Sequence, residues 1–372
     1  MIKTRITELF DAKYPIVLAG MGPFSTYKTA VKVANAGGIG LTSHWAIMTE
    51  VDPETFLISD GPNARTVSPA EKIDYDLHYI KENTIDGAVC GCNIRVARVQ
   101  ADWTSVLRRV LKLCREDRII REKVRIIVTS AGDPAPPHKK IQKYNEKNND
   151  NLLHFHVSPS LRLVKNTFKA GCDGVVAVGY EGGGHQSYEG VTTSILIPVA
   201  RSAFPDKPII AGGGFYNGQT LASALALGAD AVQMGTRFIA TSDSDFHQNL
   251  RDLIVRSQDE DTMICAGSFG PIRVIKNEYA LEHGRVLTRE EKMEQEKTLG
   301  KVSENYADIQ ANLQEDLKAM GAFYQGDLEN CIALAGQTVG GINSLPSVKE
   351  VIEEIMAECH ETIRTMYYKM GD

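Results

Sequence analysis

Eight short runs of apolar residues recur along this chain of 372 residues, and stretches with helical periodicity separate most of them. The expected strands are 16–19, 38–42, 87–94, 124–129, 152–157, 174–178, 208–212 and 231–234. The runs are almost continuously apolar, which is typical of strands buried on both faces. Strands that alternate with helices form parallel sheets through right-handed crossovers. Eight such units close most simply into an α/β fold of the TIM (β/α)8 barrel type, and an open doubly wound sheet is the alternative.

The regular alternation of strand and helix is interrupted at 53–83, at 134–151, which predicts a helix with an exposed flank, and after the eighth strand. Residues 53–83 are polar and predict a long connection outside the barrel, whereas the N-terminus should lead straight into the first strand. After the eighth strand, helix formers predict a helical subdomain over the barrel mouth, and 347–370 predicts a closing helix on the barrel wall. We therefore expect a barrel domain at 1–245, a helical subdomain at 246–324 and a C-terminal segment at 325–372.

Composition excludes several classes of function. The formal net charge of -6 argues against a nucleic-acid groove, and no apolar run approaches the roughly 18 residues that a membrane span needs. The N-terminus lacks an apolar signal region, so we expect a cytoplasmic protein. The seven scattered cysteines suit buried, reduced thiols better than a disulfide framework. A metal or redox role for the Cys90–Cys92 pair is the less favoured alternative, because its spacing is not the usual one.

Two glycine turns follow neighbouring strands near the middle of the chain. Gly213 and Gly214 end the seventh strand, and Gly235 and Thr236 end the eighth. Without side chains, glycines let a phosphate touch backbone N–H groups, and these strand ends are where barrel enzymes often hold one. The alternative is that the glycines only permit tight turns. A dinucleotide fingerprint does not fit, because the glycine spacing around 212–218 is wrong for it.

A third glycine run precedes a histidine. Residues 182–184 follow the sixth strand directly, and His185 comes next. An imidazole at this end of a barrel can donate or accept a proton near neutral pH. The alternative is a histidine that only hydrogen-bonds a neighbouring loop.

Two other strand ends suit a flat ring. Gly20, Met21 and Gly22 follow the first strand, where small residues and a soft thioether would let a planar ring lie against the backbone. Asn93 ends the third strand, and its carboxamide can both donate to and accept from the polar edge of a flavin.

His154 and His156 alternate on the fifth strand and therefore lie on one side of the sheet. A metal site needs a third ligand, and none is evident from spacing. Packing is favoured for the pair, and no metal site is predicted.

Together these segments resemble a known family. In order along the chain, the matching segments are 15–21, 35–40, 91–93, 130–134, 181–185, 211–214 and 233–238. They are similar to those of the nitronate monooxygenases, formerly called 2-nitropropane dioxygenases. Flavin-dependent enoyl-ACP reductases and some NAD(P)H:quinone reductases belong to the same superfamily. The resemblance runs from about residue 3 to 245 and continues more weakly to about 337.

The resemblance implies FMN across the C-terminal mouth of a TIM barrel. By motif, the cofactor-binding residues are Gly20, Met21 and Gly22 beside the isoalloxazine, Asn93 at its polar edge, Gly183 and Gly184 along the cofactor, and Gly213, Gly214, Gly235 and Thr236 at the phosphate, with Gln233 nearby. His185 matches the family's active-site histidine, which would position or deprotonate the substrate.

Departures from the family pattern keep two activities open. Gln186 follows the histidine at a place where many family members have a compact pair of residues. Val157 stands where some nitronate oxidisers have a lysine. The first hypothesis is a monooxygenase acting on small nitronates with O2. The second is a reductase that uses NAD(P)H to reduce enoyl thioesters or quinones, a branch that residues 272–277 resemble. A binding protein without turnover is the third. Either enzyme would act on a small molecule, without nucleic acid or membrane, and a homodimer is left open.

Overall fold

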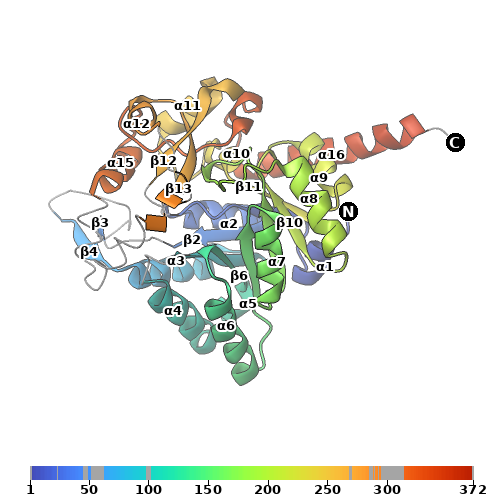
Figure 1. Cartoon of the computed structure of the whole chain (residues 1–372). Helices are drawn as coiled ribbons and strands as arrows, with labels where there is room; N and C mark the ends of the chain where they lie inside the picture. The colour runs from blue at the N-terminus through green and yellow to red at the C-terminus, as the bar shows by residue number, and fades with distance from the viewer. Residues whose placement is uncertain are drawn as a thin grey trace.

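All eight predicted strands form, and they close into a barrel in which every neighbouring pair is parallel (Figure 1). In the computed structural model, the barrel strands are β1 Ile16–Leu18, β2 Ile39–Ser43, β5 Val89–Val96, β6 Val124–Gly132, β7 Leu153–Ser158, β8 Gly174–Val178, β10 Ile209–Gly212 and β11 Ala231–Met234. Closure of β11 onto β1 confirms the TIM barrel and rules out the open sheet.

The structure describes residues 2–22, 24–44, 49–51, 63–97, 102–267, 270–284, 288, 290–291, 293–294 and 314–370. Outside the barrel, β3 Thr49–Val51 and β4 Arg65–Val67 form an antiparallel pair.

Strand side chains alternate between the barrel interior and the helix layer. On β7, Leu153 and Phe155 belong to the apolar cluster that fills the barrel, together with Val17, Leu41 and Ile210 from other strands. His154 therefore points outward, because successive residues on a strand face opposite sides.

Helices surround the barrel between successive strands. They are α2 Tyr27–Asn35, α3 Pro69–Asn83, α4 Trp103–Glu116, α5 Arg118–Lys123, α6 Ala135–Asn148, α7 Leu161–Lys169, α8 Thr193–Ala203, α9 Gly218–Ala226 and α10 Thr236–Ile239. The expected polar connection at 53–83 was wrong in its second half, since α3 occupies it. Ser68 caps this helix by accepting a hydrogen bond from the Glu71 N–H, and Ile73 and Leu77 are buried on its inner face.

The N-terminus does not lead straight into a strand, as we expected, because helix α1 Arg5–Phe10 comes first. Thr4 and Thr7 form a reciprocal capping box at its start. Ile6 and Phe10 join the apolar cluster inside the barrel, and Phe10 contacts the ring of Phe155. Helix α1 therefore contributes to the barrel core.

The region after β11 is helical, as expected, and it also contains a β-hairpin that the sequence analysis did not find. Its elements are α11 Gln248–Arg256, η1 Asp259–Asp261, β12 Thr262–Gly267, β13 Gly270–Ile275, α12 Glu278–Glu282 and α15 Gln314–Gln325. Strand β13 pairs with β12 (Figure 1). It also pairs with β9 Gly184–His185. The domain boundaries stay a prediction.

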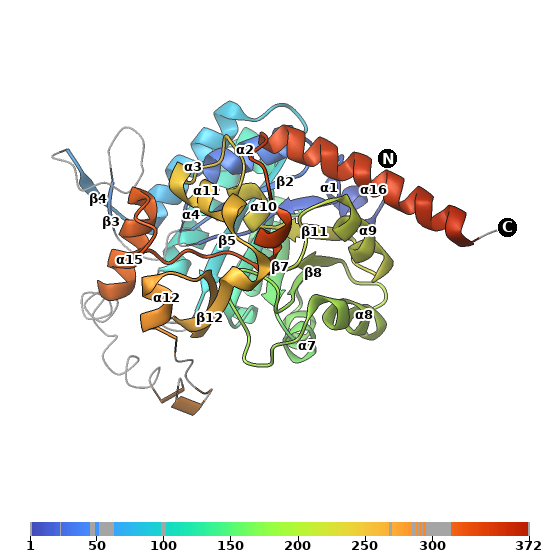
Figure 2. The same cartoon turned by 90° about the horizontal axis from the view of Figure 1, so that it is seen from above.

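The chain ends in η2 Gln337–Gly341 and the long helix α16 Val348–Met370. Figure 2 shows α16 running past α2 and α9 and continuing beyond the body of the barrel. Val348, Ile352 and Ile355 are buried in the same cluster as residues of α9, which confirms the predicted closing helix. Within the described residues, no helix combines the length and the apolar composition needed to cross a membrane.

Candidate functional site

A cavity of about 360 Å³ opens at the C-terminal ends of the barrel strands. Every residue predicted for the site lines it: Gly20, Met21, Gly22, Asn93, Gly183, Gly184, His185, Gly213, Gly214, Gln233, Gly235 and Thr236. The structure thus brings residues from five strand ends to one place, while their individual roles stay predictions.

The two central glycine turns present bare backbone to this cavity. Gly213 and Gly214 have φ values of 85° and 88°, a conformation that residues with side chains rarely adopt. Within the described part of the chain, the N–H groups of Gly213, Gly214 and Gly235 have no protein acceptor. The Thr236 hydroxyl accepts a hydrogen bond from the Gly336 N–H at 2.9 Å and can still donate its own proton. Four donors are therefore available to an anion here.

Gln233 supplies a second sign that a polar ligand belongs in the cavity. Its side chain is 7 % exposed, and among the described residues its Oε1 has no hydrogen-bond partner. A buried carbonyl oxygen without a donor costs about 1–3 kcal/mol. A ligand with an N–H or O–H group at this point would remove that cost.

Gly20 is bare because Asn93 fills the space beside it. A Cβ on Gly20 would lie 2.2 Å from Cγ of Asn93. The Asn93 side chain is buried, and its Nδ2 donates to the Val128 carbonyl at 3.4 Å. The N–H of Met21 donates to the Ser43 hydroxyl at 2.7 Å, which fixes the turn after β1. These contacts hold the amide and thioether side chains at the cavity wall.

Gly183 is constrained by the C-terminal segment. A Cβ there would lie 2.5 Å from the carbonyl carbon of Ala335, and one on Gly336 would lie 2.8 Å from the Glu181 carbonyl oxygen. The Gln337 N–H also donates to that Glu181 oxygen at 3.0 Å. The segment before η2 therefore forms part of the cavity wall.

The β12–β13 hairpin positions His185. Strand β9 pairs with β13, and the buried Arg273 donates to the Tyr180 carbonyl at 3.1 Å and to the Thr262 hydroxyl at 3.0 Å. Burial lowers the pKa of this guanidinium, and Tyr180 and Glu181 oppose the shift. The histidine itself is exposed to the cavity.

Arg95 is the main site residue that sequence reasoning missed. It is 7 % exposed, and its Nη2 lies 3.0 Å from Nε2 of His185. Its backbone N–H donates to Nδ1 of His44 at 3.2 Å, while Nε2 of His44 lies 3.0 Å from Asp102 Oδ2. The signal was available, because Arg95 follows Asn93 by two residues and a strand places such residues on the same side.

This pair fixes a tautomer. A guanidinium has five donors and no acceptor, so Nε2 of His185 must accept and its ring proton lies on Nδ1. The cavity therefore holds a cation beside an imidazole, and the four donors of the glycine turns line it as well. Such an arrangement can bind a phosphate group beside a small anionic or polar molecule.

Comparison with known proteins identifies the family of the chain. The family model described as nitronate monooxygenase matches residues 3–358. The chain belongs to the nitronate monooxygenase family, whose members are oxidoreductases of the flavin-dependent class.

Individual relatives differ in how much of the chain they match. The (3aS,4S,5R,7aS)-5-hydroxy-7a-methyl-1-oxo-octahydro-1H-indene-4-carboxyl-CoA dehydrogenase of Rhodococcus jostii (strain RHA1) is 28% identical and covers 97% of each chain. A probable nitronate monooxygenase of Staphylococcus aureus (strain MSSA476) is 27% identical over 75% of this chain and 80% of its own. The structure of FabK from Thermotoga maritima is 28% identical, with a TM-score of 0.74 over 99% of this chain and 100% of that one.

Proposed function

We propose that this protein is an FMN-dependent oxidoreductase that oxidises small alkyl nitronates with O2. One observation carries the proposal: Arg95 and His185 meet at 3.0 Å in the cavity that also holds the glycine turns. A fixed guanidinium beside an imidazole suits a small planar anion, because its forked donors match two oxygens. A nitronate is such an anion.

FMN is the flavin whose charge suits the turns. It carries one phosphate, and the N–H groups of Gly213, Gly214 and Gly235 with the Thr236 hydroxyl would hold that phosphate without a lysine. Hydrogen bonds to a charged group contribute roughly 1.5–3 kcal/mol each. Gln233 Oε1 would accept from a polar group of the same cofactor. When bound, the flavin supplies the electron acceptor that no side chain of the cavity provides.

Arg95 and His185 would have different roles toward the substrate. Arg95 would bind the anion and hold it in one orientation, and the buried guanidinium keeps its charge throughout. An anion that takes the Arg95 donors would release Nε2 of His185. That nitrogen could then take up a proton from the neutral nitroalkane form of the substrate, since a nitronate is already deprotonated.

Oxidoreduction of an acyl thioester is a second candidate. The share of this chain that its relatives match favours it. The Rhodococcus jostii relative, named a carboxyl-CoA dehydrogenase, matches 97% of this chain, against 75% for the Staphylococcus aureus one. Proton transfer beside a thioester carbonyl produces an enolate, whose oxygen Arg95 would stabilise in the same way. In this version NAD(P)H would exchange electrons with the flavin.

Anaerobic mixing separates the two candidates. The purified, flavin-loaded protein is mixed with a small alkyl nitronate, with NADH or with NADPH, and flavin absorbance is recorded. Bleaching by the nitronate, followed by turnover when O2 is admitted, is the expected result. Bleaching by a pyridine nucleotide, with reoxidation by an enoyl thioester, would favour the second candidate. Absence of bleaching by all three would contradict both.

A further inference from the structure

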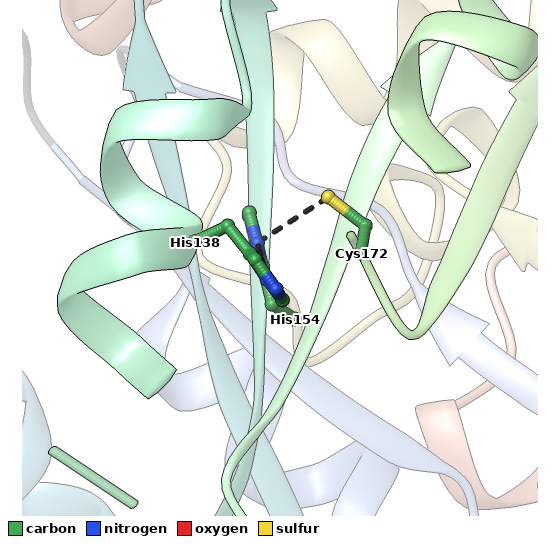
Figure 3. Close-up of side chains that lie close together, drawn as sticks. All are labelled: His138, His154 and Cys172. Carbon is green, nitrogen blue, oxygen red and sulfur yellow. Dashed lines mark hydrogen bonds between the residues drawn. The ribbon is translucent and has the colours of Figure 1, made fainter. Parts of the chain in front are cut away.

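A second polar cluster lies outside the barrel, behind strand β7. His138 comes from α6, His154 from β7, and Cys172 from the turn between α7 and β8 (Figure 3). All three side chains are buried, with exposed fractions of 7 %, 0 % and 1 %. Three elements that are distant in sequence thus place two imidazoles and a thiol together in the helix layer.

Two of the three distances within this cluster are close to those between the ligand atoms of a metal ion. Nδ1 of His138 lies 3.2 Å from Nδ1 of His154, and the Cys172 Sγ lies 3.4 Å from the same His154 nitrogen. One ligand atom from each of the three residues lies within 4.8 Å of the other two. A tetrahedral zinc ion, with Zn–N near 2.0–2.1 Å and Zn–S near 2.3 Å, sets its ligand atoms about 3.3–3.6 Å apart.

The surroundings orient the His154 ring for this role. Its Nε2 lies 2.7 Å from the Thr129 hydroxyl, which lies 2.8 Å from Nδ1 of His156. A proton on Nε2 can donate to Thr129, and Nδ1 then faces His138 and Cys172 as a lone pair. Metal-binding histidines are commonly fixed through the other ring nitrogen in this way. The ring of His138 is held in turn against Gly171, where a Cβ would lie 2.8 Å from its Nε2.

Charge near the cluster also suits a divalent cation. The Asp173 carboxylate follows Cys172 directly and accepts from the His154 backbone N–H at 2.8 Å. A Cys172 thiolate and Asp173 together supply two negative charges, which balance those of the ion.

We propose that His138, His154 and Cys172 form a binding site for a thiophilic transition-metal ion, Zn²⁺ in the first place. Two imidazoles and a thiolate are ligands that this ion prefers, and a water molecule would complete its coordination. Binding replaces the Cys172 S–H bond by a metal–sulfur bond and releases that proton to solvent. The ion would link α6, β7 and the turn before β8. This link lies behind the wall of the cavity, because His156 on the same strand lines that cavity.

Metal analysis of the flavin-loaded protein tests this site. Protein made without a polyhistidine tag, from cells grown with added zinc, should contain about one zinc ion per chain after dialysis. Cys172→Ser and His138→Gln should each lose most of it. Cys331→Ser is the matched control, because this buried thiol lies away from the cluster and donates to the Leu328 carbonyl, as a serine can. It should keep its zinc.

Growth with cobalt gives an independent signal. Wild-type protein should show cobalt ligand-field bands at longer wavelength than flavin and a thiolate-to-cobalt charge-transfer band, and Cys172→Ser should lack the latter. Flavin content and the far-ultraviolet circular dichroism spectrum check folding of each variant. Wild-type protein without stoichiometric zinc or cobalt would overturn the proposal, and so would Cys172→Ser that folds and keeps the full metal content. In either case the cluster would be a hydrogen-bonded triad, with His138 and Cys172 donating to His154.

Discussion

At the scale of single residues, the glycines of the site serve different purposes. Gly20 is bare to admit Asn93, and Gly183 to admit the chain at Ala335. Gly235 differs, because its φ is negative and the nearest side chains to a Cβ would be Ala19 and Met21, at the ordinary contact distances of 3.4 and 3.6 Å. It is therefore the glycine at which an added side chain tests cofactor binding with little disturbance of the backbone.

Gly235→Val should yield folded protein with little or no bound flavin, because its methyl groups would occupy the space of the phosphate. The ratio of visible to ultraviolet absorbance after purification measures the flavin content. Gly321→Ala is the control, since a Cβ there meets nothing within 4 Å, and it should bind flavin normally. Full flavin occupancy in Gly235→Val would contradict the placement of the phosphate.

Arg95 and His185 should affect turnover more than flavin content. Arg95→Met should lower kcat/KM by about 10²–10³-fold, as removal of a charge-stabilising donor does. His185→Asn should lower it by about 10²–10⁴-fold, as loss of a proton-transfer group does. Steady-state kinetics with the substrate identified by anaerobic mixing measures both. Arg95→Lys keeps the charge without the fork and should fall between Arg95→Met and wild type, and unchanged rates in all three would make the pair structural.

At the scale of elements, a buried ion pair joins α3 to α2 and β2. Lys72 and Asp76 contact each other, and both side chains are 1% exposed. The hydroxyls of Thr42 and Ser25 also donate to Asp76, at 2.8 and 3.2 Å, and the Lys72 ammonium lies 4.4 Å from the centre of the Tyr27 ring. Burial lowers the pKa of Lys72 and raises that of Asp76, and each partner opposes the other's shift.

Asp76→Asn should lower the free energy of unfolding by about 3–5 kcal/mol, because it removes the carboxylate in direct contact with a buried ammonium. Urea unfolding followed by circular dichroism measures the loss. The double variant Lys72→Met/Asp76→Leu removes both charges and should recover much of that stability. A double variant as unstable as the single one would mean that packing, and not charge, sets the cost.

Helix α16 offers a comparison within one element. Ile352 is 0% exposed against the barrel wall, whereas Ile363 is 39% exposed further along the helix. Ile352→Ala should cost about 2–5 kcal/mol of unfolding free energy, and Ile363→Ala much less, since only the first opens a cavity. Equal losses in urea unfolding would show that the exposed end of α16 is packed against something in solution.

At the scale of the whole molecule, all seven cysteines are free and buried. Burial raises the pKa of Cys90 and Cys114 to about 12. A thiol with that pKa is about 10⁻⁴ ionised at pH 8. Since only the thiolate reacts, such a thiol is almost entirely in its unreactive form. The expected cytoplasmic location stays a prediction. Thiols that are not joined in disulfides are consistent with a reducing compartment.

A thiol-specific disulfide reagent at pH 8 should therefore react slowly with the native protein and rapidly with all seven thiols in denaturant. The rate should rise with pH, since the thiolate fraction grows as the pH approaches the raised pKa. Prompt reaction of native protein at pH 8 would mean that at least one thiol is accessible.

Local sequence determined the barrel and most of the cavity lining. The eight apolar runs became the eight strands because buried parallel strands must be apolar on both faces. Glycines and polar residues at the ends of those strands met in one cavity because a closed parallel barrel brings all its strand ends to one rim. These features depend on short segments, so each could be predicted without knowing its neighbours.

Only the tertiary structure decided the remaining contacts. The approach of Arg95 to His185, the hairpin that pairs with β9, and the meeting of His138, His154 and Cys172 each join segments that are separated in sequence. The helix α3 and the pair Lys72–Asp76 were missed for the same reason, since a polar sequence looks like a solvated loop until its charges find partners. Which polar groups face one another depends on the packing of distant elements, and residue spacing carries no record of that.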